Sequence, residues 1–176
     1  MTLEQRVKDT IRDVADFPRE GIVFKDLTTL LLDPDLTGDI IDWMAGIMDG
    51  SVDAVAAVES RGFWFGPAVA QRLGVPFIPL RKKGKLPGET DEIGYELEYG
   101  RATIEVHRGH IRPGWRVWVH DDLLATGGTA VAAAELIRKQ DAHVAGFCFL
   151  THLAFLRGEE ALHDITPDLH WLAQFK

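Results

Sequence analysis

A turn of small residues at positions 125–129 carries a dense set of potential hydrogen-bond donors. Gly127 and Gly128 allow neighbouring backbone N–H groups to point the same way, and Thr126 and Thr129 add hydroxyl donors. Apolar residues recur at helical spacing directly after this turn, so the turn opens a predicted helix. Because N–H groups at the positive end of a helix bind anions, the turn is a predicted phosphate site.

Two adjacent carboxylates, Asp121 and Asp122, precede the turn. The β-branched residues Val117 and Val119 indicate that a short buried strand leads into them. Carboxylates repel a phosphate, but they accept hydrogen bonds from sugar hydroxyl groups or bind a hydrated divalent cation. The segment therefore predicts a ligand with a phosphate at one end and hydroxyl groups a few ångströms away. The two common glycine-rich nucleotide motifs are absent from it.

Polar residues also follow two other predicted strands, the apolar runs at positions 52–58 and 77–80. These residues are Glu59, Ser60, Arg61, Arg81, Lys82 and Lys85. Strands that alternate with helices pair in parallel, and their ligands bind beyond the carboxyl ends of the strands. All three polar groups should therefore meet in one pocket, where an arginine can bind two phosphate oxygens at once.

The acidic pair and its turn resemble the phosphoribosyl-diphosphate signature of the type I phosphoribosyltransferases. Three further blocks, at positions 58–67, 81–88 and 95–100, are similar in order and spacing to the adenine branch of that family. The similarity extends from about Asp16 to the C-terminus. It implies a type I phosphoribosyltransferase fold: a parallel twisted sheet with helices on both faces. The N-terminal segment would form a small hood, and a long mobile loop at about 82–101 would serve as a lid.

The resemblance implies a magnesium-dependent reaction of purine salvage. Adenine and 5-phosphoribosyl 1-diphosphate would give AMP and pyrophosphate through an oxocarbenium-like transition state. Magnesium would be held mainly by oxygen atoms of the substrate, with no direct protein ligand. A homodimer is expected, in which some diphosphate contacts come from the partner subunit.

The resemblance and the residue chemistry together imply four groups of site residues. The phosphoribosyl group would contact Asp121, Asp122, Ala125, Thr126, Gly127, Gly128 and Thr129. The diphosphate would contact Ser60, Arg61, Arg81, Lys82 and Lys85. Glu98 would be the catalytic acid or base, and Tyr99 would help to position the reactants. The base would contact Val23, Phe24, Lys25 and Leu153.

Two histidines depart from the family pattern. His120 stands where a β-branched apolar residue is usual, and His152 stands where a glutamate is frequent. A histidine in a core position is most often a structural residue, but either side chain could make the site sensitive to pH near neutrality.

Length and composition indicate a single domain of 176 residues that functions in the cytoplasm. The net charge of −8 argues against a nucleic-acid surface, and the sequence contains no stretch long and apolar enough for a membrane span. Cys148 is the one cysteine and lies in an apolar run, which predicts a buried inert thiol.

The pattern of apolar residues predicts the main elements. A helix should contain Leu3, Val7, Ile11 and Val14, and a second should begin at Asp33 and Pro34 and stop before Gly50. A third helix should run from Pro67 to Gly74. The four predicted strands lie at 52–58, 77–80, 115–119 and 144–150, whereas positions 82–101 should form a long polar loop.

Two alternative functions remain open at this stage. A related transferase that acts on hypoxanthine, guanine or xanthine would want a donor such as lysine near C6 of the base, and no obvious candidate lies outside the diphosphate group. A non-catalytic regulator that senses phosphoribosyl diphosphate would usually carry a DNA-binding extension. Only about fifteen residues precede the similarity here, and the lid glutamate is present.

Overall fold

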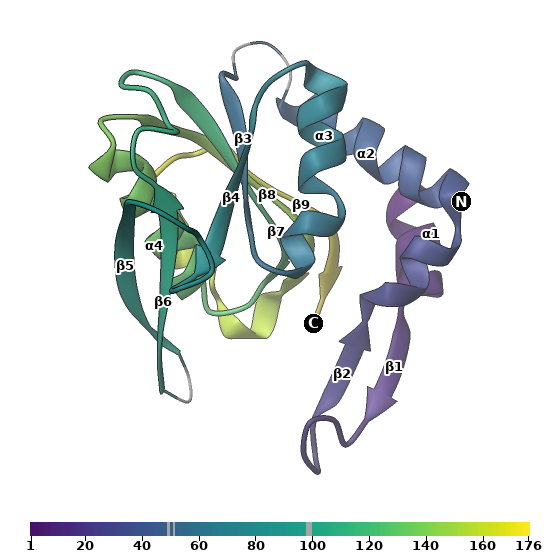
Figure 1. The fold of residues 1–176 in the computed structure, drawn as a ribbon. Coiled ribbons are helices and arrows are strands. Elements are labelled where there is room, and N and C mark those ends of the chain that lie inside the picture. Colours follow the sequence, from purple (N-terminus) through teal and green to yellow (C-terminus); the bar gives the residue numbers. More distant parts are fainter. Residues whose placement is uncertain (49, 51, 98–99) are drawn as a thin grey trace.

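A seven-stranded sheet with the order β5-β6-β4-β3-β7-β8-β9 forms the centre of the molecule, and a separate two-stranded sheet pairs β1 with β2 (Figure 1). The computed structural model describes residues 1–48, 50, 52–97 and 100–176. Its strands are β1 (Arg12–Ala15), β2 (Val23–Asp26), β3 (Ala54–Val58), β4 (Phe77–Lys82), β5 (Thr90–Leu97), β6 (Gly100–His107), β7 (Arg116–Leu124), β8 (His143–Leu153) and β9 (Leu169–Phe175). Its helices are α1 (Leu3–Thr10), α2 (Pro34–Met48), α3 (Gly66–Leu73), α4 (Gly128–Lys139) and α5 (Glu160–His163), with short 3-10 turns η1 (Leu27–Leu32), η2 (Arg61–Trp64) and η3 (Ala154–Leu156).

Five neighbouring strands of the large sheet run parallel. They are β4, β3, β7, β8 and β9, and their pairings are continuous along the sheet. The crossover from β3 to β4 contains α3, and the crossover from β7 to β8 contains α4. This arrangement confirms the predicted fold class. It also brings the carboxyl ends of β3, β4 and β7 to the same edge of the sheet.

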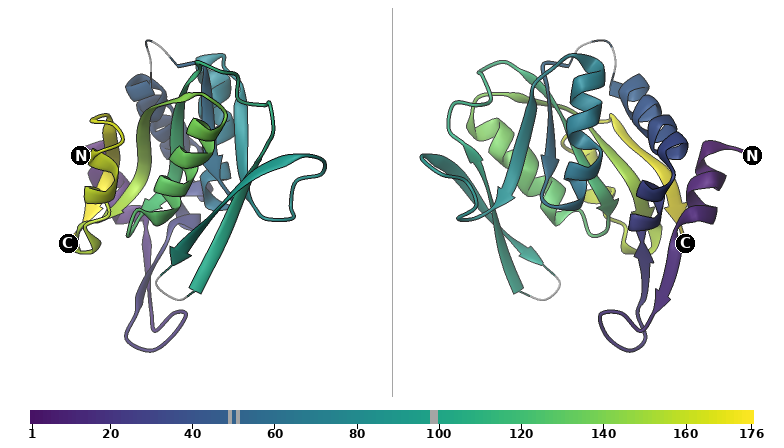
Figure 2. Two further views of the ribbon diagram at one scale, coloured as in Figure 1. Left: turned by 90° about the vertical axis from the view of Figure 1, so that its left-hand side faces the viewer. Right: turned by 45° about the vertical axis from the view of Figure 1, so that its right-hand side comes forward.

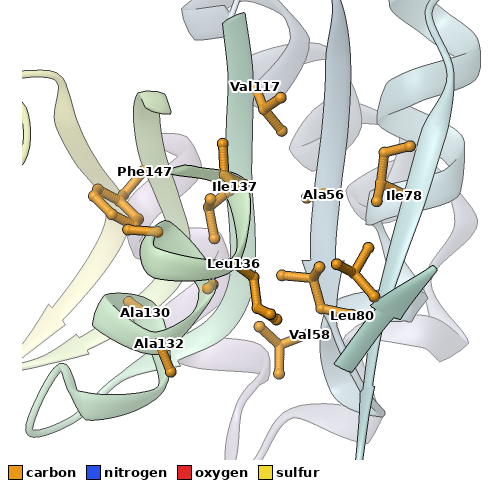
Figure 3. Packing of buried hydrophobic residues seen from close by; sticks show 14 of the residues in the cluster. Ala56, Val58, Ile78, Leu80, Val117, Ala130, Ala132, Leu136, Ile137 and Phe147 are labelled. Carbon is orange, nitrogen blue, oxygen red and sulfur yellow. The ribbon is translucent and has the colours of Figure 1, made fainter. Parts of the chain in front are cut away.

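Helices cover both faces of the sheet (Figure 2). Helix α4 packs on one face, where Leu136 and Ile137 meet side chains of β3, β4 and β7 such as Val58 and Leu80 (Figure 3). Helices α1, α2 and α3 pack on the other face against a second apolar cluster that includes Trp118. The side chains of β3 are buried throughout, which is typical of a central strand in a parallel sheet. Within the described ranges, no helix is long and apolar enough to cross a membrane.

Positions 82–101 differ from the predicted polar loop. Most of them belong to β4, β5 and the start of β6, and β5 pairs antiparallel with β6 from Thr90↔His107 to Leu97↔Gly100. β6 in turn pairs antiparallel with the end of β4. A period-two pattern explains the strands, because Ile93 and Tyr95 pack against the core while Glu92 and Glu96 are exposed. The sheet is therefore mixed, with an antiparallel hairpin at one edge.

The N-terminal segment also differs in one respect from its prediction. Helix α1 ends at Thr10, and Val14 lies in β1 instead of continuing the helical stripe. Ile11 already has an extended backbone, so the chain leaves the helix there. Strands β1 and β2 then form a hairpin that projects from the body of the molecule (Figure 1). An ion pair of 2.6 Å between Arg12 and Asp26 joins the two strands at the base of this hairpin.

Most other predicted boundaries are confirmed. Pro34 is the first residue of α2, and the carboxylate of Asp33 accepts a hydrogen bond of 2.9 Å from the backbone N–H of Leu36. Gly74 ends α3 in a left-handed conformation with φ 71°. Strands β7 and β8 extend further than predicted, to Leu124 and Leu153, because their backbones stay paired beyond the apolar residues. Strands β1, β2 and β9 were not predicted from the sequence.

Candidate active site

Residues from three strand ends line one cavity at the carboxyl edge of the parallel strands. Arg61 follows β3, Lys82 ends β4, and Asp121 lies near the end of β7. The cavity has a volume of about 250 Å³. Its described lining consists of Val58, Glu59, Ser60, Arg61, Lys82, Tyr95, Ile104, Asp121, Asp122 and Thr129. The predicted diphosphate residues Ser60, Arg61 and Lys82 therefore share a cavity with the acidic pair.

Asp122 is the buried charged residue in the described lining of this cavity, and Asp121 beside it is half-buried. Asp122 forms an ion pair with Arg61, in which Nε lies 2.9 Å from Oδ2, and its side chain is only 4% exposed. Burial raises the pKa of Asp122, although the charge of Arg61 opposes this effect. Burial and the neighbouring charge of Asp122 also raise the pKa of Asp121. Carboxylates that are so poorly solvated gain strongly from hydroxyl donors or positive charge.

The turn of small residues lies directly beside this cavity. It lines a second cavity of about 120 Å³, and Asp121 and Thr129 belong to both. Gly127 has φ 83°, a conformation that favours glycine, and helix α4 begins at Gly128. The described lining of this cavity is Asp121, Leu123, Leu124, Ala125, Thr126, Gly127, Gly128, Thr129, Ala130 and Phe149. The predicted phosphate turn and the predicted diphosphate residues thus open into adjoining spaces.

Strand β5 lies against the same turn. A Cβ atom added at Gly128 would lie 3.3 Å from the backbone oxygen of Glu96 and 3.8 Å from the ring of Tyr95. Tyr95 also lines the larger cavity, which the sequence analysis missed. Its place between Ile93 and Leu97, on the same face of a period-two pattern, was the available signal. Glu98 and Tyr99, the predicted catalytic residues, lie outside the described residues.

Arg81 and Lys85 are arranged differently from Arg61. The Nε atom of Arg81 lies 2.7 Å from Oε2 of Glu59, so an intramolecular carboxylate already pairs with this guanidinium. Lys85 donates its backbone N–H to Glu105 over 2.9 Å, and Lys85 is exposed. Neither residue lines the cavity that contains Arg61. Glu59 was treated only as part of a polar group in the sequence, yet it lines the cavity and orients Arg81.

The predicted base residues Val23, Phe24 and Lys25 lie together on β2, in the projecting hairpin. The guanidinium carbon of Arg61 lies 5.8 Å from the centre of the Phe24 ring, which links this hairpin to the diphosphate residues. Phe24 also makes an edge contact of 5.0 Å with Phe17. Lys25 is paired with Asp13 at 2.6 Å.

Leu153, the fourth predicted base residue, ends β8 and is partly buried. It pairs in register with Phe175 of β9. The Nζ atom of Lys25 lies 4.7 Å from the centre of the same Phe175 ring. Phe175 therefore connects the end of β8 with the projecting hairpin.

The two histidines that depart from the family pattern are both buried. His120 is 0% exposed, its Nδ1 atom lies 2.8 Å from the backbone oxygen of Cys148, and burial lowers its pKa to about 4. The side chain of His120 is therefore neutral near pH 7, and it forms no hydrogen bond with Asp121 or Asp122. His152 is 1% exposed and forms a hydrogen bond of 2.9 Å with Glu159. Burial also raises the pKa of Cys148, as expected for an inert thiol.

Comparison with known proteins agrees with this geometry. A family model described as a phosphoribosyl transferase domain matches residues 28–170. The adenine phosphoribosyltransferase of Cytophaga hutchinsonii is 51% identical over 161 residues, covering 91% of this chain and 89% of the relative. The corresponding enzyme of Sorangium cellulosum is 53% identical over 163 residues, covering 92% and 82%.

Solved structures give the same result. The crystal structure of adenine phosphoribosyltransferase from Thermoanaerobacter pseudethanolicus superposes with a TM-score of 0.93 at 44% identity and covers 99% of this chain and 100% of the other. The enzyme from Saccharomyces cerevisiae, in complex with adenine and an imino-altritol bisphosphate, superposes with a TM-score of 0.88 at 36% identity. It covers 97% of this chain and 98% of the other.

Proposed function

The chain belongs to the adenine phosphoribosyltransferases, a branch of the phosphoribosyl transferase family, and from this premise we propose that it converts adenine and 5-phosphoribosyl 1-diphosphate into AMP and pyrophosphate in purine salvage. One observation carries the assignment beyond family membership. Arg61, Asp121 and Thr129 line one cavity, which adjoins the turn of small residues. A phosphorylated sugar with a diphosphate at C1 presents the complementary groups in the same order. Its diphosphate matches Arg61, its hydroxyl groups match Asp121, and its 5′-phosphate matches the turn.

We assign the two ends of the cavity to the two ends of the substrate. The 5′-phosphate accepts hydrogen bonds from the turn of Ala125, Thr126, Gly127, Gly128 and Thr129 at the start of α4. The ribose hydroxyls donate to Asp121 and Asp122, whose carboxylates have raised pKa values through desolvation and therefore gain from these donors. The diphosphate meets Ser60, Arg61 and Lys82 at the other end.

Arg81 and Lys85 complete the proposed diphosphate group. They lie near the end of β4 but do not line the cavity. We propose that some of these contacts are made across a homodimer, so that a basic residue of one subunit reaches the site of the other. The cytoplasm is the proposed compartment, in keeping with the single buried thiol.

Magnesium fits this site through the substrate. Among the described residues, no group of three or more potential ligand side chains could form a metal cage. The carboxylates of Asp121 and Asp122 in the cavity, together with the diphosphate of the bound substrate, suit a magnesium ion that keeps much of its water. When bound, magnesium neutralises charge that develops on the leaving pyrophosphate. Within the chain itself, Arg61 lines the end of the cavity assigned to the diphosphate and supplies positive charge there.

The reaction forms a bond between N9 of adenine and the anomeric carbon, while the bond from that carbon to the diphosphate oxygen breaks. It needs no covalent bond to the protein, so orientation and charge neutralisation dominate. We propose that Glu98 moves the proton at the purine and that Tyr99 positions the reactants. In the sequence both follow β5, whose described residues lie beside the turn at Gly128. A lid in this place excludes water, which would otherwise hydrolyse the activated sugar.

The adenine ring is proposed to bind beside β2. Phe24 would stack on one face and Leu153 would cover the other, while backbone groups of Val23 and Lys25 read the purine edge. The contact of 5.8 Å between Phe24 and Arg61 supports this placement, because it brings the base residues next to the diphosphate residues. The anomeric carbon must lie between those two groups.

Turnover with each purine base tests the proposal. Protein, magnesium and 5-phosphoribosyl 1-diphosphate are mixed with adenine, guanine, hypoxanthine or xanthine, and nucleotide formation is followed by chromatography. We expect AMP from adenine and far slower product formation from the other bases. A preference for guanine or hypoxanthine would overturn the base assignment. Binding of 5-phosphoribosyl 1-diphosphate without any turnover would instead support a regulator.

A further inference from the structure

A second loop packs directly against the turn of small residues. This supporting loop, residues 157–160, follows η3 and leads into α5. A Cβ atom at Gly158 would lie 2.0 Å from the backbone oxygen of Ala125, and one at Gly127 would lie 2.6 Å from the backbone oxygen of Gly158. The backbones of the two loops are therefore in direct contact, without an intervening side chain. Any displacement of the supporting loop must change the position of the turn.

One part-buried hydrogen bond ties this loop to the sheet. His152, next to Leu124 in the register of β7 and β8, places its Nε2 atom 2.9 Å from Oε2 of Glu159. The ring is held in place by Trp171 of β9, at a centroid distance of 4.3 Å. Leu124 is the last residue before the turn begins. The hydrogen bond therefore joins the end of β8, which pairs with the last residue before the turn, to the supporting loop.

The hydrogen bond is directional. Glu159 accepts it, so Nε2 of His152 carries the proton, while the buried Nδ1 atom has no partner among the described residues. Burial alone raises the pKa of Glu159, but hydrogen bonds from its own backbone and from His152 outweigh this effect and lower it. A charged acceptor makes the bond stronger than a neutral one. The neighbouring Glu160 pairs with Arg157 at the surface instead and does not contact His152.

We propose that His152 and Glu159 are positioning residues for the 5′-phosphate: their hydrogen bond holds the supporting loop against the turn and so sets the position of its N–H donors. The inference rests on the proposed function, because it assigns the turn to the 5′-phosphate. It goes further by naming two residues that do not touch the substrate.

Calorimetry with three ligands tests the inference. AMP and ribose 5-phosphate carry the 5′-phosphate, whereas magnesium pyrophosphate occupies only the end of the cavity near Arg61. We expect Glu159→Ala to weaken AMP and ribose 5-phosphate binding about tenfold, the order expected for loss of one charge-assisted hydrogen bond. Pyrophosphate affinity should stay as in the unaltered protein. The matched control Glu160→Ala removes a carboxylate from the same loop and should leave all three affinities unchanged.

A pair of substitutions at His152 isolates the donor. In His152→Gln the side-chain amide reaches the place of Nε2 and can donate to Glu159, so binding should be close to that of the unaltered protein. In His152→Leu the donor is lost while the buried volume is kept, so ligands with a 5′-phosphate should bind about tenfold more weakly. His152→Leu and Glu159→Ala should raise KM for 5-phosphoribosyl 1-diphosphate more than they lower kcat, whereas His152→Gln should change neither strongly.

The outcomes separate the two proposals. If Glu159→Ala and His152→Leu bind AMP as tightly as the unaltered protein, the inference is wrong while the proposed function stands. Equal weakening of AMP and pyrophosphate would also overturn it, because that is the pattern of general destabilisation. If the unaltered protein binds neither AMP nor ribose 5-phosphate, the proposed function fails first.

Discussion

At the scale of single residues, His120 shows how burial decides protonation. Its ring is fully buried beside Phe65, and burial lowers its pKa to about 4, whereas an unfolded histidine titrates near 6.5. The unfolded chain therefore binds more protons than the native one between these values. Stability from this residue is complete above about pH 6.5 and falls as the pH decreases towards 4.

A variant at this position tests the effect. His120→Val should remove the slope, because valine has no proton to bind. Between pH 7 and pH 5, the unaltered protein should lose about 2 kcal/mol more unfolding free energy than the variant. Urea unfolding at both values measures this difference. Parallel pH profiles for the two proteins would show that His120 is charged or solvated in the native state.

Glu98 is the residue on which the proposed chemistry most depends. Glu98→Gln keeps the size of the side chain and removes its ability to take up a proton at the purine. We expect kcat to fall by about 10² to 10⁴, the usual range for loss of a general acid or base. Single-turnover kinetics with adenine measures the change. Glu96→Gln, two positions earlier on the exposed side of β5, is the matched control and should retain normal turnover.

At the scale of elements, β5 lies in close contact with the start of α4. Gly128 lies so close to Glu96 that a single Cβ would already be 3.3 Å from its backbone oxygen. The bulk of a valine must then move β5 or block the turn. Gly128→Val should therefore abolish AMP binding with little loss of thermal stability. Calorimetry and a melting curve check both, and undiminished AMP affinity would refute the placement of the phosphate.

Periodicity explains which elements could be predicted from the sequence. Helices α2 and α3 have clear caps at Asp33 and Gly74, and β3 is a short apolar run. These signals made the three elements predictable, and the structure confirms their positions. Strands β5 and β6 carry many charges, which concealed an alternation that includes Ile93 and Tyr95. Their stability comes from pairing with β4 and packing against the core, which are tertiary effects.

The site shows the same division. Its charged residues could be placed at one edge because parallel strands share the direction of their carboxyl ends. The pairing of Arg81 with Glu59 and of His152 with Glu159 could not be read from the sequence, because each joins residues whose side-chain directions depend on packing. The contact between Phe24 of the hairpin and Arg61 of η2 joins two elements far apart in the sequence, so it too depends on tertiary packing.

At the scale of the whole molecule, one subunit leaves several large apolar side chains exposed. Leu32 is 83% exposed and Phe155 is 63% exposed. A homodimer would offer a place to cover such groups and to supply basic residues across the interface. We expect sedimentation at micromolar concentration to give twice the chain mass of 19.6 kDa. A species of one chain mass with full turnover would contradict the dimer.

The division of the molecule into two sheets has a practical consequence for protein engineering. Positions 23–25 belong to the two-stranded sheet, whereas Asp121, Asp122 and the glycine turn belong to the large sheet and its crossover. A library randomised at position 24, where the side chain is proposed to stack on the base, should thus sample new nucleobase preferences while the sugar-handling half keeps its shape. Gly127 and Gly158 leave no space for a side chain and Gly128 leaves little, so all three should be held constant in any such library.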